Sequence, residues 1–215
     1  MIKNKDEDFQ DNMPIYTSKC SLVRDLYWKR IGTAIKFAEL KNENVILDIG
    51  CNTGYLLRKI RKVNTKCECW GIDIEPKIIT INIENCQFRV ADVTKMPFKD
   101  NFFDIIFALS TLEHIKDLKS AIKEISRVLK PNGFVVISSP TESSFYRFCR
   151  FLLFGVFEKN VKRNELGFRG DIDFHFQNAY EIEKKFQESG FTKILQKSLP
   201  GFPVPELHRI VKFQK

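Results

Sequence analysis

The sequence predicts an α/β fold in which helices cover both faces of a mostly parallel sheet. Between residues 44 and 138, short apolar segments alternate with segments whose apolar residues recur at helical spacing, as in β-α-β units. One segment, Phe103–Leu109, is almost continuously apolar, which is typical of a parallel strand buried on both faces. A length of 215 residues with 43% hydrophobic residues favours one domain with a substantial core.

The first expected element is an N-terminal helix. In residues 21–40, apolar side chains recur at roughly helical spacing, namely Leu22, Leu26, Ile31, Ile35 and Phe37. The chain begins with an acidic, polar stretch, whereas a signal peptide would be basic and then apolar. We therefore expect a flexible segment over 1–20, a single domain over 21–215 and a cytoplasmic protein.

Seven strands and three more helices follow. The strands are expected at Asn44–Ile49, Glu68–Ile74, Gln87–Val93, Phe103–Leu109, Phe134–Ser138, Phe191–Gln196 and about Glu206–Phe213. The helices are expected at about Tyr55–Lys62, Leu118–Leu129 and Ala179–Glu188. The last two strands should pair antiparallel, which gives a mostly parallel seven-stranded sheet with an antiparallel edge strand.

An aromatic insert, residues 141–176, follows the fifth predicted strand. It holds eight of the 20 phenylalanines, and its apolar run from Phe145 to Phe157 is broken by two arginines. A helix that is apolar nearly all round must be covered by something. We expect a helical lid that contacts the substrate through Phe145, Arg147, Phe148, Arg150 and Phe151. Two alternatives remain open: a lid over the active site alone, or a lid that also touches a lipid or membrane surface.

The turn after the first predicted strand is a candidate ligand site. The apolar strand runs into Gly50-Cys51-Asn52-Thr53-Gly54, where glycine lets the backbone approach a ligand closely. Ligands bind at the carboxyl ends of parallel strands, where this turn lies. Bulky residues after Gly54 exclude the third glycine of a dinucleotide fingerprint, and the segment has no Walker lysine.

With Asp48 before the turn, this segment resembles motif I of the class I S-adenosylmethionine (AdoMet)-dependent methyltransferases, which usually reads D-x-G-x-G-x-G. Asn52 stands where the family has its middle glycine. Because asparagine tolerates left-handed backbone, we expect the turn to keep its shape.

Two acids after later strands continue the resemblance. By resemblance, Asp73 is the ribose ligand and Ile74 lies beside the adenine. Asp92 likewise takes the role of the ligand to the adenine amino group, with Val93 against the ring.

Two further segments are similar to the fourth and fifth strands of the type 11 methyltransferases: Phe102–Ile106 with Ser110–Ile115, and Leu129–Phe134. The resemblance covers about residues 40–140 and implies a Rossmann-like, doubly wound fold. It implies AdoMet as cofactor, S-adenosylhomocysteine as product and no metal, with O- or C-methylation of a small-molecule or lipid-linked acceptor. The implied cofactor contacts are Asp48, Gly50, Cys51, Asn52, Gly54, Asp73, Ile74, Asp92, Val93 and Leu109.

Methyl transfer from a sulfonium is an in-line displacement, so the enzyme mainly aligns the reactants and excludes water. An oxygen or acidic-carbon nucleophile would also profit from a base. His114 is the first candidate because it follows the fourth strand, and a structural role near the cofactor is the alternative. His175 is a second catalytic candidate, although its two phenylalanine neighbours favour a structural role or a substrate contact.

The net charge of +8 suits a phosphate-bearing partner or simply a solvated surface. A nucleic-acid methyltransferase is therefore an alternative, but the Ala108–Thr111 segment lacks the motif of base amino-group methylation, and we expect no nucleic-acid partner. A non-catalytic AdoMet-binding protein is a second alternative, against which Asp73 and Asp92 argue. Peripheral membrane contact stays open. Six cysteines without C-x-x-C spacing indicate a reducing compartment and no zinc site.

Overall fold

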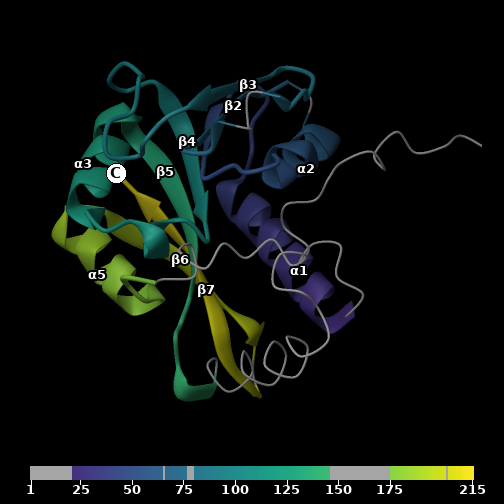
Figure 1. Ribbon diagram of the computed structural model, residues 1–215, viewed down its shortest axis with the longest axis vertical. Coiled ribbons are helices and arrows are strands. Elements are labelled where there is room, and N and C mark those ends of the chain that lie inside the picture. The colour runs from purple at the N-terminus through teal and green to yellow at the C-terminus, as the bar shows by residue number, and fades with distance from the viewer. Residues whose placement is uncertain (1–20, 65, 77–79, 146–174, 202) are drawn as a thin grey trace, which may run out of the picture.

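One seven-stranded sheet forms the centre of the computed structural model, which describes residues 21–64, 66–76, 80–145, 175–201 and 203–215 (Figure 1). The strands are β1 (Val45–Ile49), β2 (Glu68–Asp73), β3 (Cys86–Val90), β4 (Phe103–Leu109), β5 (Leu129–Pro140), β6 (Thr192–Gly201) and β7 (Val204–Gln214). Their order is β3-β2-β1-β4-β5-β7-β6. Strands β1 to β5 are parallel, and β7 is antiparallel to both β5 and β6. The predicted fold class is confirmed.

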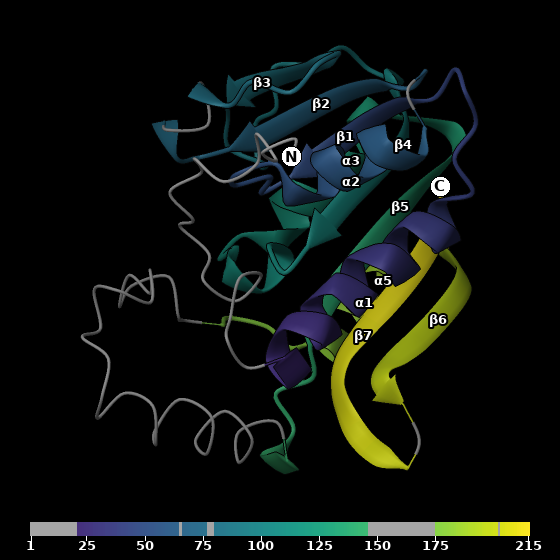
Figure 2. The same ribbon diagram turned by 90° about the vertical axis from the view of Figure 1, so that its right-hand side faces the viewer.

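Helices cover both faces of this sheet. They are α1 (Ser21–Ala38), α2 (Tyr55–Val63), α3 (Leu118–Val128), α5 (Ala179–Glu188) and the short 3₁₀ helix η2 (Leu112–His114). α1 and α2 lie on one face, and α3 and α5 lie on the other (Figure 1). Figure 2 shows α1 lying along β7. None of the described helices is long and apolar enough to cross a membrane.

The alternation of side chains along β1 supplies both halves of the core. Ile46 packs with Ile31 of α1 and Leu57 of α2. Its neighbour Leu47 packs on the opposite face, with Ile122 of α3. All five side chains are almost completely buried. Because both faces of the central strands are covered, a ligand approaches the sheet at the ends of its strands.

Several strand boundaries differ from the prediction, two of them for local reasons. β3 ends at Val90, three residues earlier than expected, because the chain turns at Asp92, whose carboxylate accepts the backbone N–H of Thr94. β5 begins at Leu129, so the predicted turn at 130–133 lies within the strand as an irregularity in its pairing with β4. Asn132 adopts a left-handed φ of 61° there.

Most of the predicted lid lies outside the described residues, which omit 146–174. Arg147, Phe148, Arg150 and Phe151 fall in that range, whereas Phe145 is described and partly buried. The segment 1–20, expected to be flexible, also lies outside the described residues.

Candidate functional site

The parallel strands bring four chain segments together at one edge of the sheet. Gly50 follows β1, Asp73 ends β2, Ser110 follows β4 and Thr141 follows β5. In open α/β sheets this carboxyl edge is where ligands bind. The candidate site is therefore built from segments that are far apart in the sequence.

The turn after β1 has little room for side chains. Gly50 and Gly54 have positive φ of 70° and 78°, and Asn52 has a φ of 43°, as predicted for an asparagine in left-handed backbone. A Cβ atom on Gly50 would lie 2.3 Å from Oγ1 of Thr111. That threonine hydroxyl in turn donates to the carbonyl of Ile49, at 3.0 Å. The turn after β1 is thus locked against the segment after β4.

Asp73 connects β2 to the same turn. One oxygen of its carboxylate accepts the backbone N–H of Asn52 at 3.0 Å, and the other accepts the N–H of Glu75 at 3.1 Å. Each carboxylate oxygen can accept a second hydrogen bond, so capacity for a ligand remains. The next side chain, Ile74, is 73% exposed, which is unusual for an isoleucine and leaves an apolar surface at the strand end.

Asp48, by contrast, is only 4% exposed. Burial and then the nearby negative charge of Asp73 hold its pKa well above the usual range, against the opposing influence of Arg30. Cys51 of the turn is also buried, and burial raises the pKa of its thiol, which stays protonated. Asp48 and Cys51, both among the predicted cofactor contacts, are therefore buried against the protein.

The loop after β3 presents an exposed carboxylate. Asp92 is exposed, and one of its oxygens accepts both the N–H and the hydroxyl of Thr94, each at 2.8 Å. Val93 was expected to contact the adenine, but it is 5% exposed and packs in the core cluster with α3. Leu109, at the end of β4, is partly buried against the opposite cluster.

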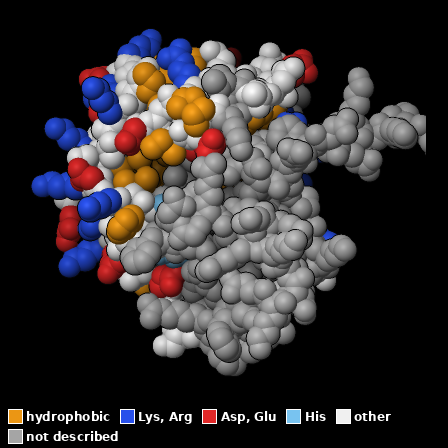
Figure 3. Space-filling model, viewed as in Figure 1, with side chains coloured by type: hydrophobic (Ala, Val, Ile, Leu, Met, Phe, Trp, Pro, Cys, Tyr) orange, Lys and Arg blue, Asp and Glu red, His pale blue; other side chains and the backbone are white. Residues whose placement is uncertain are grey.

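The two histidines that the sequence analysis gave as separate catalytic candidates lie in contact. His114 ends η2 and His175 precedes α5, and their ring centroids are 4.9 Å apart in an edge-to-face arrangement. Both are partly buried, and histidine reaches the surface in Figure 3 beside hydrophobic side chains. The structure thus places both catalytic candidates at one point, next to the end of β4.

Two glutamates that sequence reasoning missed complete this cluster. The carboxylate of Glu142 binds Nδ1 of His175. Glu113, only 1% exposed, accepts a hydrogen bond from the hydroxyl of Ser139 at 3.1 Å. Burial raises the pKa of Glu113, although its electrostatic interactions with neighbouring groups, His114 first, oppose the shift. Only the adjacency of Glu113 to His114 could have pointed to it in the sequence.

A buried cation from α1 also reaches this edge. The guanidinium of Arg30, 2% exposed, donates to the hydroxyl of Ser110 and lies 4.8 Å from the centre of the Tyr27 ring. In the sequence Arg30 is one of several cations between the apolar positions of a helix, so nothing local marked it for burial. Its charge lies where the turn after β1 meets the segment after β4.

The third histidine serves the packing of the sheet. His208 of β7 is 4% exposed, and its ring meets the ring of Tyr27 edge to face at 5.5 Å. Burial, followed by the positive charges of Arg30 and His175, lowers the pKa of His208 to about 3. This ring is therefore neutral at physiological pH.

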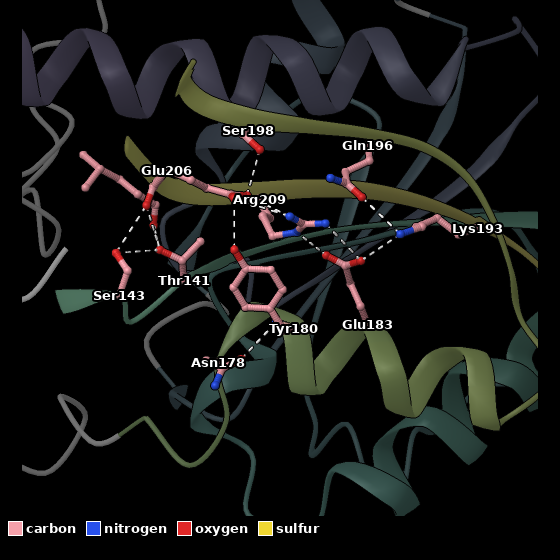
Figure 4. A network of polar contacts seen from close by, with 11 residues as sticks. Thr141, Ser143, Asn178, Tyr180, Glu183, Lys193, Gln196, Ser198, Glu206 and Arg209 are labelled. Atoms are coloured by element: carbon pink, nitrogen blue, oxygen red, sulfur yellow. Dashed lines mark hydrogen bonds and ion pairs between the residues drawn. The ribbon is translucent and has the colours of Figure 1, made fainter. Parts of the chain in front are cut away.

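A polar network fixes the segments that carry His175 and Glu142 (Figure 4). Arg209 of β7 binds Glu183 of α5 and Glu206, and Tyr180 donates to Glu206 at 3.1 Å. Asn178 begins α5 with a capping box, three residues after His175. The network therefore anchors the start of α5 and, with it, the histidine.

Comparisons with known proteins agree with this geometry. Residues 47–137 match a family model described as a methyltransferase domain. The demethylmenaquinone methyltransferase of Staphylococcus aureus is 29% identical over an alignment 172 residues long, which covers 72% of this chain and 70% of that protein.

Solved structures share the fold. One is the N-methyltransferase NodS from Bradyrhizobium japonicum, in complex with S-adenosyl-L-homocysteine. It has a TM-score of 0.63 and 17% identity, covering 88% of this chain and 87% of that one. A SAM-dependent methyltransferase from Methanosarcina mazei has a TM-score of 0.61 and 22% identity, covering 84% and 96%.

Proposed function

We infer the acceptor and the site residues from one premise: the chain belongs to the class I AdoMet-dependent methyltransferases, with a type 11 methyltransferase domain at residues 47–137. AdoMet is its cofactor and methyl donor. We propose that the acceptor is a small organic molecule held beside His114 and His175. The observation that carries this proposal is the contact between those two rings at the carboxyl edge of the sheet, next to the turn after β1.

In this proposal AdoMet lies across the ends of β1, β2 and β3. The Asp73 carboxylate, already oriented by two backbone N–H groups, accepts the ribose hydroxyls. Ile74 supplies apolar contact to the adenine, and Asp92 accepts its amino group. The glycines of the turn allow the close approach that a nucleoside needs. Asp48 and Cys51, being buried, act by shaping the turn instead of touching the cofactor.

The transferred methyl then faces the segment after β4. An acceptor oxygen or acidic carbon attacks it in line with the breaking carbon–sulfur bond, and the acceptor proton passes to the histidine pair. The name of the Staphylococcus aureus relative indicates a menaquinone precursor as the acceptor of that protein. We propose an acceptor of the same kind here, small and largely apolar, covered by the 141–176 insert within a single 21–215 domain.

The test is AdoMet turnover on separate acceptor pools. Purified protein with labelled AdoMet should methylate a component of a bacterial lipid extract or of a quinone precursor mixture, and it should leave RNA and protein pools unlabelled. Labelling of RNA alone would contradict the proposal in favour of the nucleic-acid alternative that the net charge of +8 suggests. AdoMet binding without transfer to any pool would support a non-catalytic protein.

A lipid-linked acceptor has its own test at the insert. If the acceptor carries a lipid tail, reversing the charges of Arg147 and Arg150 to Glu should reduce binding to anionic vesicles, because these cations would meet lipid phosphates. AdoMet affinity should stay the same. Sedimentation with vesicles at low and physiological salt measures the effect. No vesicle binding by the wild type at either salt would leave a non-lipid acceptor.

A further inference from the structure

Three groups able to ligate a metal converge at the end of η2 and before α5. One ligand atom each from Glu113, His114 and His175 lies within 4.8 Å of the other two. We propose that these residues, the Glu-His-His cluster, bind a divalent first-row transition-metal ion such as Zn²⁺. This goes beyond the proposed methyl transfer and differs from the metal-free site that the family resemblance implied.

The set of donors suits such an ion. Two imidazoles and one carboxylate are the protein ligands of several catalytic zinc sites and of mononuclear iron sites, both of which keep open positions. Ligand atoms at about 2.0–2.2 Å from a tetrahedral ion lie roughly 3.5 Å apart. The three ligand atoms of the cluster lie within 4.8 Å of one another, so the side chains would have to move only slightly closer together to reach this spacing.

A metal-bound histidine usually donates its other ring N–H to an outer partner, such as a carboxylate that does not touch the metal. His175, before α5, already has such a partner. The Glu142 carboxylate binds Nδ1 of His175, which fixes that nitrogen as the protonated one and leaves Nε2 for an ion. A histidine kept for packing alone has no need of a carboxylate on one nitrogen and a second imidazole beside its ring. The contact orients the His175 ring as the outer partner of a metal-bound histidine does, with Nε2 directed away from Glu142.

Glu142 itself is held firmly. Its backbone has a left-handed φ of 52°. The residues on both sides of it donate hydrogen bonds to the same backbone carbonyl. The hydroxyl of Thr141 donates to the carbonyl of Glu206 at 2.8 Å, and that of Ser143 does so at 3.5 Å (Figure 4). A positioned outer partner lowers the reorganisation that ion binding would require.

The charge balance also favours an ion. Glu113 is a carboxylate with 1% exposure, and one of its oxygens is occupied by the Ser139 hydroxyl. A buried carboxylate is costly unless it is paired or coordinates a metal. The charged or titratable groups that act on it are Arg30, His114 and His175. A divalent ion between the imidazoles would stabilise the ionised carboxylate that coordination requires.

An ion at this position has a chemical role in the proposed reaction, and this step alone rests on the proposed function. With three protein ligands, the ion keeps a position open for an acceptor hydroxyl, whose pKa it lowers. When the ion is bound, the proton leaves to solvent and not to the histidine pair, because the ion occupies the imidazole nitrogens that would otherwise accept it. The resulting oxygen anion forms the new bond to the methyl carbon as the carbon–sulfur bond breaks. The ion is neither oxidised nor reduced.

The experiment uses the full-length protein after treatment with a chelator. Calorimetry with Zn²⁺ and absorption spectroscopy with Co²⁺ should both show one ion per chain. Co²⁺ should give the visible bands of a low-coordinate site. Glu113→Gln, His114→Ala and His175→Ala should each weaken binding by at least about 100-fold, and Glu142→Gln by about 10- to 100-fold, as expected for an outer partner. Circular dichroism establishes that each variant is folded.

Cys86→Ser is the matched control, because a partly exposed thiol could bind the same ions. This variant should bind like the wild type. Binding that disappears in Cys86→Ser, binding that survives in both His175→Ala and Glu142→Gln, or no binding up to about 100 µM would overturn the proposal. The variants His175→Ala and Glu142→Gln test the metal site even if Glu113→Gln fails to fold.

AdoMet titration of the same metal-free samples separates the two hypotheses. If the protein binds an ion and its AdoMet affinity is the same with and without that ion, the result supports both the cofactor site and the metal site. Absence of AdoMet binding contradicts the proposed cofactor site but leaves the metal result standing. A metal-free protein that methylates its acceptor at the full rate would restrict the ion to a structural role and contradict its chemical role.

Discussion

At the scale of single residues, Asp73 has two tasks that need to be separated. Its carboxylate orients the turn after β1 through the N–H of Asn52, and we propose that it also binds the ribose. These tasks are compatible because a carboxylate oxygen accepts more than one hydrogen bond. In this proposal, a substitution at this position affects the cofactor both directly and through the shape of the turn.

Asp73→Ala should weaken AdoMet binding by about 1.5–3 kcal/mol, the usual range for hydrogen bonds to a charged group, or about 10- to 100-fold in Kd. Asp73→Asn keeps one neutral hydrogen-bond acceptor and should lose less AdoMet affinity than Asp73→Ala. Calorimetry measures both. Asp100→Ala, an exposed aspartate far from this edge whose partner is Arg127, should bind AdoMet like the wild type. Unchanged affinity in Asp73→Ala would remove Asp73 from the cofactor site.

His114 should matter for turnover more than for cofactor binding, because it lies with His175 beside the end of β4 and away from β2 and β3. In either proposed role, as a base or as a metal ligand, it would act on the acceptor and not on AdoMet. We expect His114→Ala to lower kcat by about 10²- to 10⁴-fold, the usual contribution of general-base catalysis, and to leave the AdoMet Kd unchanged. A loss confined to AdoMet affinity would make the histidine structural.

At the scale of elements, α5 is fixed to the β6–β7 hairpin by charge as well as by apolar packing. Phe186 of α5 stacks on Phe213 of β7, with ring centroids 5.1 Å apart. Glu183, 5% exposed, meets Arg209 of β7 and Lys193 of β6. This attachment places the helix, and His175 just before it, against the end of β4.

Replacing Glu183 by Ala should destabilise the protein by about 1.5–3 kcal/mol, because it removes one of the two carboxylate partners of the mostly buried Arg209 and leaves only Glu206. Glu188→Ala on the same helix is the matched control. Its pairing with Lys184 is solvent-exposed, at 3.8 Å, and surface pairs of this kind contribute about 0.5 kcal/mol or less. Urea denaturation compares the two variants. Equal stabilities would show that the network adds nothing to the apolar packing of α5.

At the scale of the whole molecule, charge is distributed differently inside and outside. On the face seen in Figure 3, basic and acidic side chains alternate over the side where α3 and α5 lie, without gathering into one basic patch. The interior, in contrast, contains Arg30, Asp48, Glu113 and His208 close to the carboxyl edge of the sheet. Stability should therefore respond to pH through these buried groups.

Among these buried groups, His208 has the effect of pH on stability whose direction is clearest. Its folded-state pKa is lowered to about 3, so the neutral ring stabilises the fold fully above the unfolded pKa of about 6.5. This contribution is lost as pH falls from about 6.5 towards 3, and it amounts to about 2 kcal/mol lost at pH 5. The free energy of unfolding, measured at pH 7.5 and pH 5, should fall by that much more in the wild type than in His208→Asn. Identical pH dependence in the two proteins would mean that His208 does not titrate as expected.

The sequence by itself determined the order and type of the elements and the positions of the motifs. Helical and strand periodicity are encoded within a few residues, and the parallel connections bring the carboxyl ends of β1 to β5 to one edge. The turn after β1, Asp73 and Asp92 could therefore be assigned to that edge. The left-handed conformation of Asn52 followed equally from a local preference, and the structure confirms it.

Only the tertiary structure decided which side chains meet and which are buried. Glu142 reaches His175 across the 141–176 insert, and Arg30 reaches Ser110 from a helix that precedes the sheet. Neither contact has a local signal, because it depends on how distant elements pack. For the same reason Val93, which the family pattern placed against the adenine, lies in the core. Spacing along the chain fixes the edge on which a residue lies, whereas the packing of neighbouring elements fixes the direction of its side chain.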